Sequence, residues 1–260
     1  DGCVLVESKG LVLQQVAGKA ALGADESLAS HLYQVKWRPA ALAVHESTES
    51  RTGENWLVIG AVEHLGEAVA RTLRAAGNEC VLIDTRWTLR DEVKVQVAQL
   101  LTGQERAGAP FHGVLYLAGL EEQPACGPTG EEAVTELLYC TQALLEHEAA
   151  VSPRLWVVTR GAQPVGDEIV DAPGQAALWG LARTIALEAP SLRCSMLDLG
   201  GGDVSNDAVL ISREILAGLP ENQVAYRGGE RLLARLVRGA AAGAPAMRYA
   251  APEEGYCLRT

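Results

Sequence analysis

Positive charge is scarce in this sequence. Only four of its 260 residues are lysine, and 22 Lys and Arg residues stand against 33 Asp and Glu residues, which gives a formal net charge of −11. Nucleic-acid backbones and anionic membrane surfaces bind clustered Lys and Arg side chains. We therefore expect neither nucleic acid nor a membrane among the partners of the protein.

Segments that direct a chain into or across a membrane are also missing. No apolar run approaches the roughly 20 residues that a membrane-spanning helix needs. The N-terminus has neither the basic nor the apolar region of a signal peptide, and Asp1 stands where a start methionine would be. We expect a cytoplasmic chain that is a piece of a longer polypeptide.

Close-spaced metal ligands are absent as well. None of the six cysteines forms a CxxC pair, and the five histidines show no HxH or HxxxH spacing. Metal sites usually need such spacing, and small disulfide frameworks have a higher density of cysteine. The sequence predicts no metal site and reduced thiols. The cysteines are Cys3, Cys80, Cys126, Cys140, Cys194 and Cys257.

Aromatic side chains are few, with a single Phe, so that Ala, Leu and Val must fill the core. Apolar residues make up 48% and charged residues 21% of the chain, an ordinary balance for a globular domain. From residue 55 on, short apolar runs alternate with stretches of helical periodicity, which favours an α/β fold with a parallel sheet between two layers of helices. Buried strands are predicted at 56–59, 80–83, 113–118, 155–158 and 194–199, and helices at 66–76, 89–101, 131–148, 174–187 and 208–218.

Two further segments alternate apolar and polar residues. Leu32–Trp37 stops before Pro39, which is typical of an edge strand. Gln223–Arg227 and Arg231–Leu236 predict a hairpin. Because each segment has one face to bury, we predict that Leu32–Trp37 pairs with this hairpin and closes the sheet.

The first strand-to-helix turn, Gly60–Gly66, lacks the glycines of a dinucleotide-binding loop. A GxGxxG loop lets the backbone approach the pyrophosphate at a helix N-terminus. With Gly66 as the last glycine, Ala61 and Glu63 occupy the other two positions, and the Glu63 carboxylate would repel a pyrophosphate. Asp84 lies where a ribose-binding acid would be, but it is interpreted as a turn or cap residue. We predict no cofactor-binding residue in this chain.

The catalytic residues of a short-chain reductase are missing too. Such an enzyme needs a Tyr with a Lys four residues later, and none of the six tyrosines has a Lys at that distance. After the fourth parallel strand, where a catalytic Ser is expected, Thr159 offers a hydroxyl without an accompanying base. Trp179, at helical spacing from Gln175 and Arg183, is interpreted as a packing residue. We predict no catalytic residue, and a GxSxG elbow does not occur either.

One long motif and two shorter segments carry a family resemblance. The motif is Gly174–Glu188, which reads GQAALWGLARTIALE and is followed by LRC at 192–194 and LDL at 197–199. Together with the entry strand Leu32–Trp37 and the hairpin Val224–Arg231, it resembles the ketoreductase region of modular type I polyketide synthases. In that family a truncated structural Rossmann-like subdomain precedes a second one that binds NADPH and carries the Ser, Tyr and Lys. The resemblance implies that this chain is the structural, Rossmann-like half, without a functional dinucleotide-binding loop.

The two ends of the chain carry further resemblances. Residues 1–22 look like the last hairpin of a dehydratase, 23–31 like a linker, and 239–260 like a linker with the first strand of an enoyl reductase; 32–238 is then the structural subdomain. The implied partners are the dehydratase, the enoyl reductase and the catalytic ketoreductase half of the same polypeptide. The implied parent is a homodimer that uses NADPH and phosphopantetheine, and neither cofactor is expected in this chain.

Three functions are compatible with these features. The first is a noncatalytic structural subdomain that supports NADPH-dependent β-ketoacyl reduction by the partner half, so that the isolated chain is not an enzyme. The second is a divergent short-chain NAD(P)-dependent reductase, which NADPH binding would favour. The third is a free-standing Rossmann-type interaction module, which a gene ending near Thr260 would favour. Candidates for an exposed contact with a partner are Trp179 and the hairpin of Tyr226, although either residue fits a core position as well.

Overall fold

A computed structural model describes residues 32–42, 52–60, 62–85, 90–120, 130–147, 152–166, 170 and 172–238. The contacts divide the chain into two units, Val35–Arg235 and the chain ends 1–34 with 236–260. Of the second unit, only residues 32–34 and 236–238 are described. The segments that resemble a dehydratase hairpin and an enoyl reductase strand, with the linkers beside them, lie outside the described residues.

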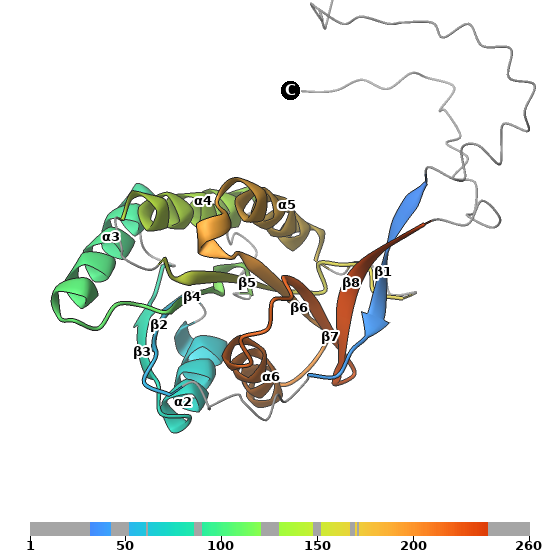
Figure 1. Cartoon of the computed structure of the whole chain (residues 1–260), viewed down its shortest axis with the longest axis horizontal. Helices are drawn as coiled ribbons and strands as arrows, with labels where there is room; N and C mark the ends of the chain where they lie inside the picture. The colour runs from blue at the N-terminus through green and yellow to red at the C-terminus, as the bar shows by residue number, and fades with distance from the viewer. Residues whose placement is uncertain are drawn as a thin grey trace, which may run out of the picture. The chain divides into compact units, whose positions relative to one another are not determined.

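The unit Val35–Arg235 is built around one sheet (Figure 1). The described strands form an eight-stranded sheet in the order β1-β8-β7-β6-β5-β4-β2-β3. The strands from β2 to β7 pair in parallel, and β8 runs antiparallel to β7. The predicted α/β class with a Rossmann-like sheet is therefore confirmed. The strands are β1 Tyr33–Pro39, β2 Asn55–Ile59, β3 Glu79–Ile83, β4 Gly113–Tyr116, β5 Arg154–Arg160, β6 Ser195–Leu199, β7 Gln223–Arg227 and β8 Glu230–Arg238.

Helices cover both faces of the sheet. Figure 1 shows α3, α4 and α5 side by side on one face and α2 with α6 on the other. Each predicted helix forms, although the ends differ by several residues. The helices are α2 Glu67–Ala75, α3 Arg90–Arg106, α4 Gly130–Glu146, α5 Pro173–Glu188 and α6 Val204–Leu216.

The two large cores among the described residues form because successive strand residues point to opposite faces of the sheet, and a small third cluster holds Val165, Ala225 and Leu232. In β2, Leu57 and Ile59 belong to the cluster beneath α3, α4 and α5, whereas Trp56 and Val58 belong to the cluster beneath α2 and α6. All four side chains are buried. This burial on both faces explains why parallel strands such as β2 read as unbroken apolar runs in the sequence.

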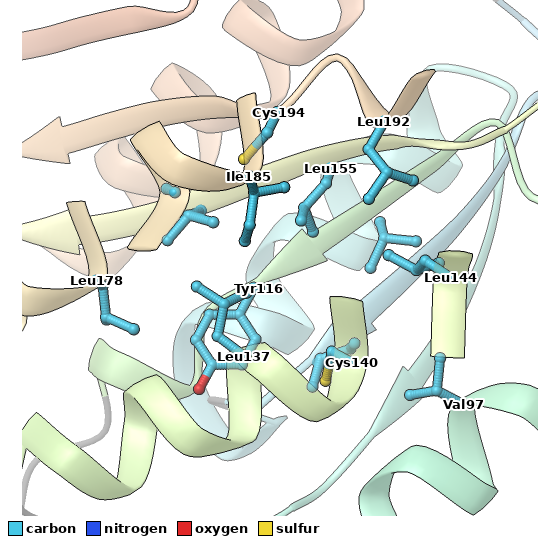
Figure 2. Close-up of a cluster of buried hydrophobic side chains, with 14 of the residues drawn as sticks. Val97, Tyr116, Leu137, Cys140, Leu144, Leu155, Leu178, Ile185, Leu192 and Cys194 are labelled. Atoms are coloured by element: carbon cyan, nitrogen blue, oxygen red, sulfur yellow. The ribbon is translucent and has the colours of Figure 1, made fainter. Parts of the chain in front are cut away.

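The larger core lies between the sheet and helices α3, α4 and α5 (Figure 2). Figure 2 shows Leu137 and Cys140 of α4 near Tyr116 of β4, with Leu178 and Ile185 approaching from α5. The Tyr116 hydroxyl donates a hydrogen bond of 2.8 Å to a backbone carbonyl oxygen in α4, that of Ala133. The aromatic ring thus fills the apolar space while its polar end is satisfied.

The edge strand pairs as the alternation predicts. Strand β1 is hydrogen-bonded to β8, and the Ala40 backbone N–H donates to the carbonyl oxygen of Arg231 at 3.0 Å. The Trp37 ring meets the Trp179 ring edge-on, with 5.9 Å between the ring centroids. The N-terminal strand therefore closes the sheet against the C-terminal hairpin, as predicted.

Two helix starts differ from the expectation. A π-helical turn at Val62–Gly66 precedes α2, so that the chain is helical almost immediately after β2. Helix α6 begins at Val204 rather than Ala208, because the Asp203 side chain accepts two backbone N–H groups of the first turn, those of Ser205 and Asn206. Apolar periodicity does not reveal the start of a helix whose first turn is mostly polar, as in α6.

Neighbouring leucines of α4 provide a test of the larger core. Leu137 is fully buried, and the next residue, Leu138, is 42% exposed. Leu137→Ala should lower the free energy of unfolding by about 2–5 kcal/mol because it leaves a cavity. Leu138→Ala should change it by less than about 0.5 kcal/mol. Urea denaturation of the two variants measures both values, and similar losses would show that α4 faces the sheet differently.

Candidate functional site at the carboxyl edge of the sheet

The carboxyl ends of the parallel strands meet at one edge of the sheet, where folds of this kind hold their ligands. Strand β2 ends at Ile59, β4 at Tyr116, β5 at Arg160 and β6 at Leu199. Their parallel registers bring the turns after them to the same edge. These turns, called the carboxyl edge below, hold the residues on which the predictions about cofactor and catalysis depend.

The turn after β2 packs closely against the turn after β4. Gly60 has a φ of +79°, and a Cβ atom added there would lie 2.5 to 2.6 Å from atoms of Ala118. Only glycine fits this approach. Packing within the protein therefore accounts for Gly60 without a bound pyrophosphate.

Two residues that a dinucleotide-binding loop would replace with glycine are not fully described by the structure. Ala61 is not among the described residues, and of Glu63 only the backbone is described. Asp84 directly follows the end of β3, as expected from the sequence. The absence of a cofactor site stays a prediction that rests on the residue types at these positions.

The Thr159 hydroxyl, near the end of β5, stands where the sequence suggested the hydroxyl of a reductase. Its side chain is fully buried. The hydroxyl donates to Oδ1 of Asp198 at 2.6 Å and accepts a hydrogen bond from Nε1 of Trp179 at 2.7 Å. A proton donated to a substrate carbonyl would have to be withdrawn from the bond to Asp198.

Asp198 in β6 receives four hydrogen bonds although it is fully buried. Besides Thr159, Oδ1 accepts the backbone N–H of Ala162 at 3.0 Å. Oδ2 accepts the backbone N–H of Gln163 at 3.2 Å and Nη2 of Arg227 at 2.6 Å. We call these five residues the carboxylate network. It satisfies both carboxylate oxygens and pairs the buried charge with one guanidinium.

Sequence reasoning quoted Asp198 only as part of the LDL motif. The available signal was a charged residue inside the predicted buried strand 194–199, since an acidic side chain in such a strand needs a partner. The partner, Arg227, lies 29 residues away in β7. Only the tertiary pairing of β6 with β7 identifies it.

Trp179 on α5 is fully buried, which confirms its interpretation as a packing residue. The alternative, an exposed contact for a partner, is wrong for this residue because its indole lies inside the core and is hydrogen-bonded to Thr159. The Arg183 guanidinium lies over the indole, 5.4 Å from the ring centroid. One helical turn of α5 thus carries an indole and a guanidinium that pack against each other.

A glycine-rich turn, Gly200–Gly202, follows β6 and was not among the predicted sites. A strand, a glycine-rich turn and a helix N-terminus are the parts of many phosphate sites. Here, however, the Asp203 carboxylate takes two backbone N–H groups of the first turn of α6. Asp207, also in the first turn and buried, pairs with Arg160 at 2.6 Å. Two carboxylates of the chain thus lie at this helix N-terminus, and they would repel a phosphate.

A second buried ion pair fastens the terminal hairpin. Glu214 of α6 binds Arg231 of β8 through two hydrogen bonds of 2.7 Å and accepts the hydroxyl of Tyr226 at 2.8 Å. Burial and the charge of Glu214 raise the pKa of Tyr226. Tyr226 is 5% exposed and belongs to the core beneath α2 and α6, so the tyrosine itself is not an exposed contact. A contact through other residues of the hairpin stays a prediction.

The described cysteines are buried thiols. Cys80, Cys140 and Cys194 are free cysteines in the structure. Burial raises the pKa of Cys80 to about 11 and that of Cys194 to about 12, and it raises the pKa of Cys140 as well. Because the thiolate is the nucleophile and the metal ligand, these thiols are unreactive near neutral pH.

In the part of the chain that the structure describes, no three His, Cys, Asp or Glu residues are grouped so that they could hold a metal ion. Among the described helices, none has both the length and the apolar character needed to cross a membrane.

Sequence comparisons find relatives among polyketide synthases. The family described as polyketide synthase extender module SpnB, Rossmann fold domain, matches residues 35–236. The chain is 34% identical over 229 residues to the pikromycin polyketide synthase component PikAII of Streptomyces venezuelae, over 85% of this chain and 6% of that protein. It is 30% identical over 247 residues to the phthioceranic/hydroxyphthioceranic acid synthase of Mycobacterium tuberculosis, over 89% of this chain and 11% of that protein. The chain thus spans a small fraction of these relatives.

Solved structures with the same fold include ketoreductases of modular polyketide synthases. A C2-type ketoreductase is 28% identical with a TM-score of 0.65, and an A-type ketoreductase is 27% identical with a TM-score of 0.61. In both cases the match covers 82% of this chain and 44% of the other chain. More than half of each ketoreductase chain therefore lies outside the matched region.

The buried hydroxyl of Thr159 can be tested against an exposed one. Thr159→Val removes the partner of both Asp198 and Trp179 and should lower the free energy of unfolding by about 1–3 kcal/mol. Thr184→Val on α5, whose exposed hydroxyl donates to the carbonyl oxygen of Gly180, should change it by less than about 0.5 kcal/mol. Chemical denaturation measures both. Equal effects of the two substitutions would contradict the central place of Thr159.

Proposed function

The chain belongs to the family of Rossmann fold domains of polyketide synthase extender modules, and from this premise we propose that it is a noncatalytic structural subdomain. Its role is to support the catalytic ketoreductase half, which reduces β-ketoacyl groups with NADPH. The parent is a reducing synthase that also carries a dehydratase, an enoyl reductase and phosphopantetheine, and it acts as a homodimer in the cytoplasm. The chain itself holds no catalytic, cofactor or metal residue.

The observation that carries this proposal is the state of the Thr159 hydroxyl. General acid catalysis requires a donor within hydrogen-bond reach of the substrate. Here the donor is fully buried and already bonded to Asp198 and Trp179. The residues around it serve its hydrogen bonds rather than a ligand, which supports a structural role for the carboxyl edge.

The sizes of the related structures support a partner within the same polypeptide. The matched part makes up 44% of each of the two ketoreductase chains. The remaining part of such a chain is large enough for a second Rossmann-like subdomain. Interfaces of about 600–1,500 Å² are usual between domains of one chain, and a contact of this size is sufficient for one half to stabilise the other.

A divergent short-chain reductase is the second candidate, favoured by a hydroxyl near the end of β5 and an acid directly after β3. It would require an accessible Thr159 with a base beside it. Among the described residues, Asp198 is the only acidic group bonded to that hydroxyl, and its carboxylate also binds Arg227 and two backbone N–H groups. Because these hydrogen bonds already occupy the carboxylate, they favour the structural role.

The support role can be tested with the catalytic half. We expect the catalytic ketoreductase half, expressed with this chain, to give a higher folded yield and a melting temperature higher by about 5–10 °C than the half alone, because a partner that binds only the folded state stabilises it. The rate of ketone reduction should likewise be higher with this chain than without it. Equal stability and activity of the half alone would contradict the proposal.

A control separates structural support from a hidden nucleotide site. The double variant Ala61→Gly and Glu63→Gly gives the turn after β2 the residues of a dinucleotide-binding loop. In the mixture with the catalytic half, this variant should leave reduction unchanged. A change in activity would indicate that the turn takes part in cofactor binding.

A further inference from the structure

We propose that the loop after β5 forms a latent binding site for a small carboxylate, and that Asp198 of the same chain fills this site. Residues 160–166 follow the place where a reductase would carry its catalytic hydroxyl. The loop is therefore closed by an internal anion, and its order does not depend on a substrate or cofactor.

The donor set is that of an anion site. Four donors from three different segments converge on one carboxylate: the Thr159 hydroxyl, two consecutive backbone N–H groups at Ala162 and Gln163, and the Arg227 guanidinium. Consecutive backbone N–H groups form concave anion-binding surfaces. A guanidinium supplies the matching positive charge.

The loop itself has the conformation that this arrangement needs. Gly161 has a φ of +61° and directly precedes Ala162, and Gly166 has a φ of +63°. The Gln163 carbonyl oxygen accepts Nη2 of Arg227 at 3.1 Å, so the guanidinium holds the loop as well as the carboxylate. The backbone N–H of residue 163 thus binds the Asp198 carboxylate, and its carbonyl oxygen binds the Arg227 guanidinium.

The carboxylate comes from β6, the strand beside the loop. Asp198 pairs in register with Thr159, so its side chain reaches the donors without any rearrangement of the backbone. Its carboxyl group is fully buried. The site is therefore filled by a side chain of the protein itself, in contrast to a substrate site, which fills and empties.

This inference rests on the proposed noncatalytic role of the carboxyl edge. Its test nevertheless reads the stability of this chain alone, whereas the support role is read from a partner half. If the internal site were refuted, the chain could still support a partner, and if the support role failed, the internal site could still stand.

Removal of the carboxylate and its chemical replacement test the site. Asp198→Ala in the full chain should lower the melting temperature by about 10 °C, because Arg227 loses its buried partner. Sodium formate should then raise the melting temperature of this variant by several degrees in a saturable manner. Sodium chloride at the same ionic strength and the neutral analogue formamide should not. The wild-type chain should respond to none of them beyond a common salt effect.

Two further variants keep the test decisive. Asp203→Ala removes a carboxylate that also accepts two backbone N–H groups but is exposed, and formate should not restore its stability. Asp198→Asn keeps nearly the same side-chain shape but removes the charge. This variant should speed hydrogen exchange at the amides of Ala162 and Gln163 at least tenfold. Equal responses of Asp198→Ala to formate and chloride, or unchanged exchange in Asp198→Asn, would overturn the proposal.

Discussion

Asp198 is a fully buried charge near the carboxyl end of β6, a central strand of the sheet. Hydrogen-bond donors from the surrounding elements compensate for its removal from water. Taking a carboxylate out of water costs several kcal/mol, and removal of one partner of such a pair costs about 3–5 kcal/mol. The hydrogen bonds to Asp198 come from β5, the loop after it and β7, while α5 joins through Trp179 and Thr159. The relative positions of these elements are thus fixed at the carboxyl edge of the sheet.

The same constraint bears on function. In a reductase of this fold, the carboxyl edge has to leave hydroxyl, amide and cationic groups free for ligands. In this chain the corresponding groups bind Asp198, Asp203 and Asp207. These polar groups therefore stabilise the fold itself, which agrees with the proposed structural role.

The sheet and its helices could be predicted because burial on both faces turns strands such as Trp56–Ile59 into unbroken apolar runs. The alternation of the edge strand led to its pairing with the hairpin, although its apolar face is not buried: Tyr33 and Val35 are more than half exposed, and Trp37 is the side chain that packs against the core. The ion pairs could not be predicted, since Arg227 and Arg231 meet their acids across 29 and 17 residues of sequence. The alternative that Trp179 is an exposed contact was wrong for a related reason. An aromatic side chain with a polar end can be buried when the fold supplies a hydrogen-bond partner for that end.

The central claim, that this Rossmann-like chain uses its carboxyl edge for its own structure and not for a nucleotide, is tested most directly by calorimetric titration of the folded chain with NADPH. The account predicts no binding with a dissociation constant below about 100 μM, which corresponds to roughly −5.5 kcal/mol. A tighter dissociation constant with a stoichiometry of one nucleotide per chain would contradict it.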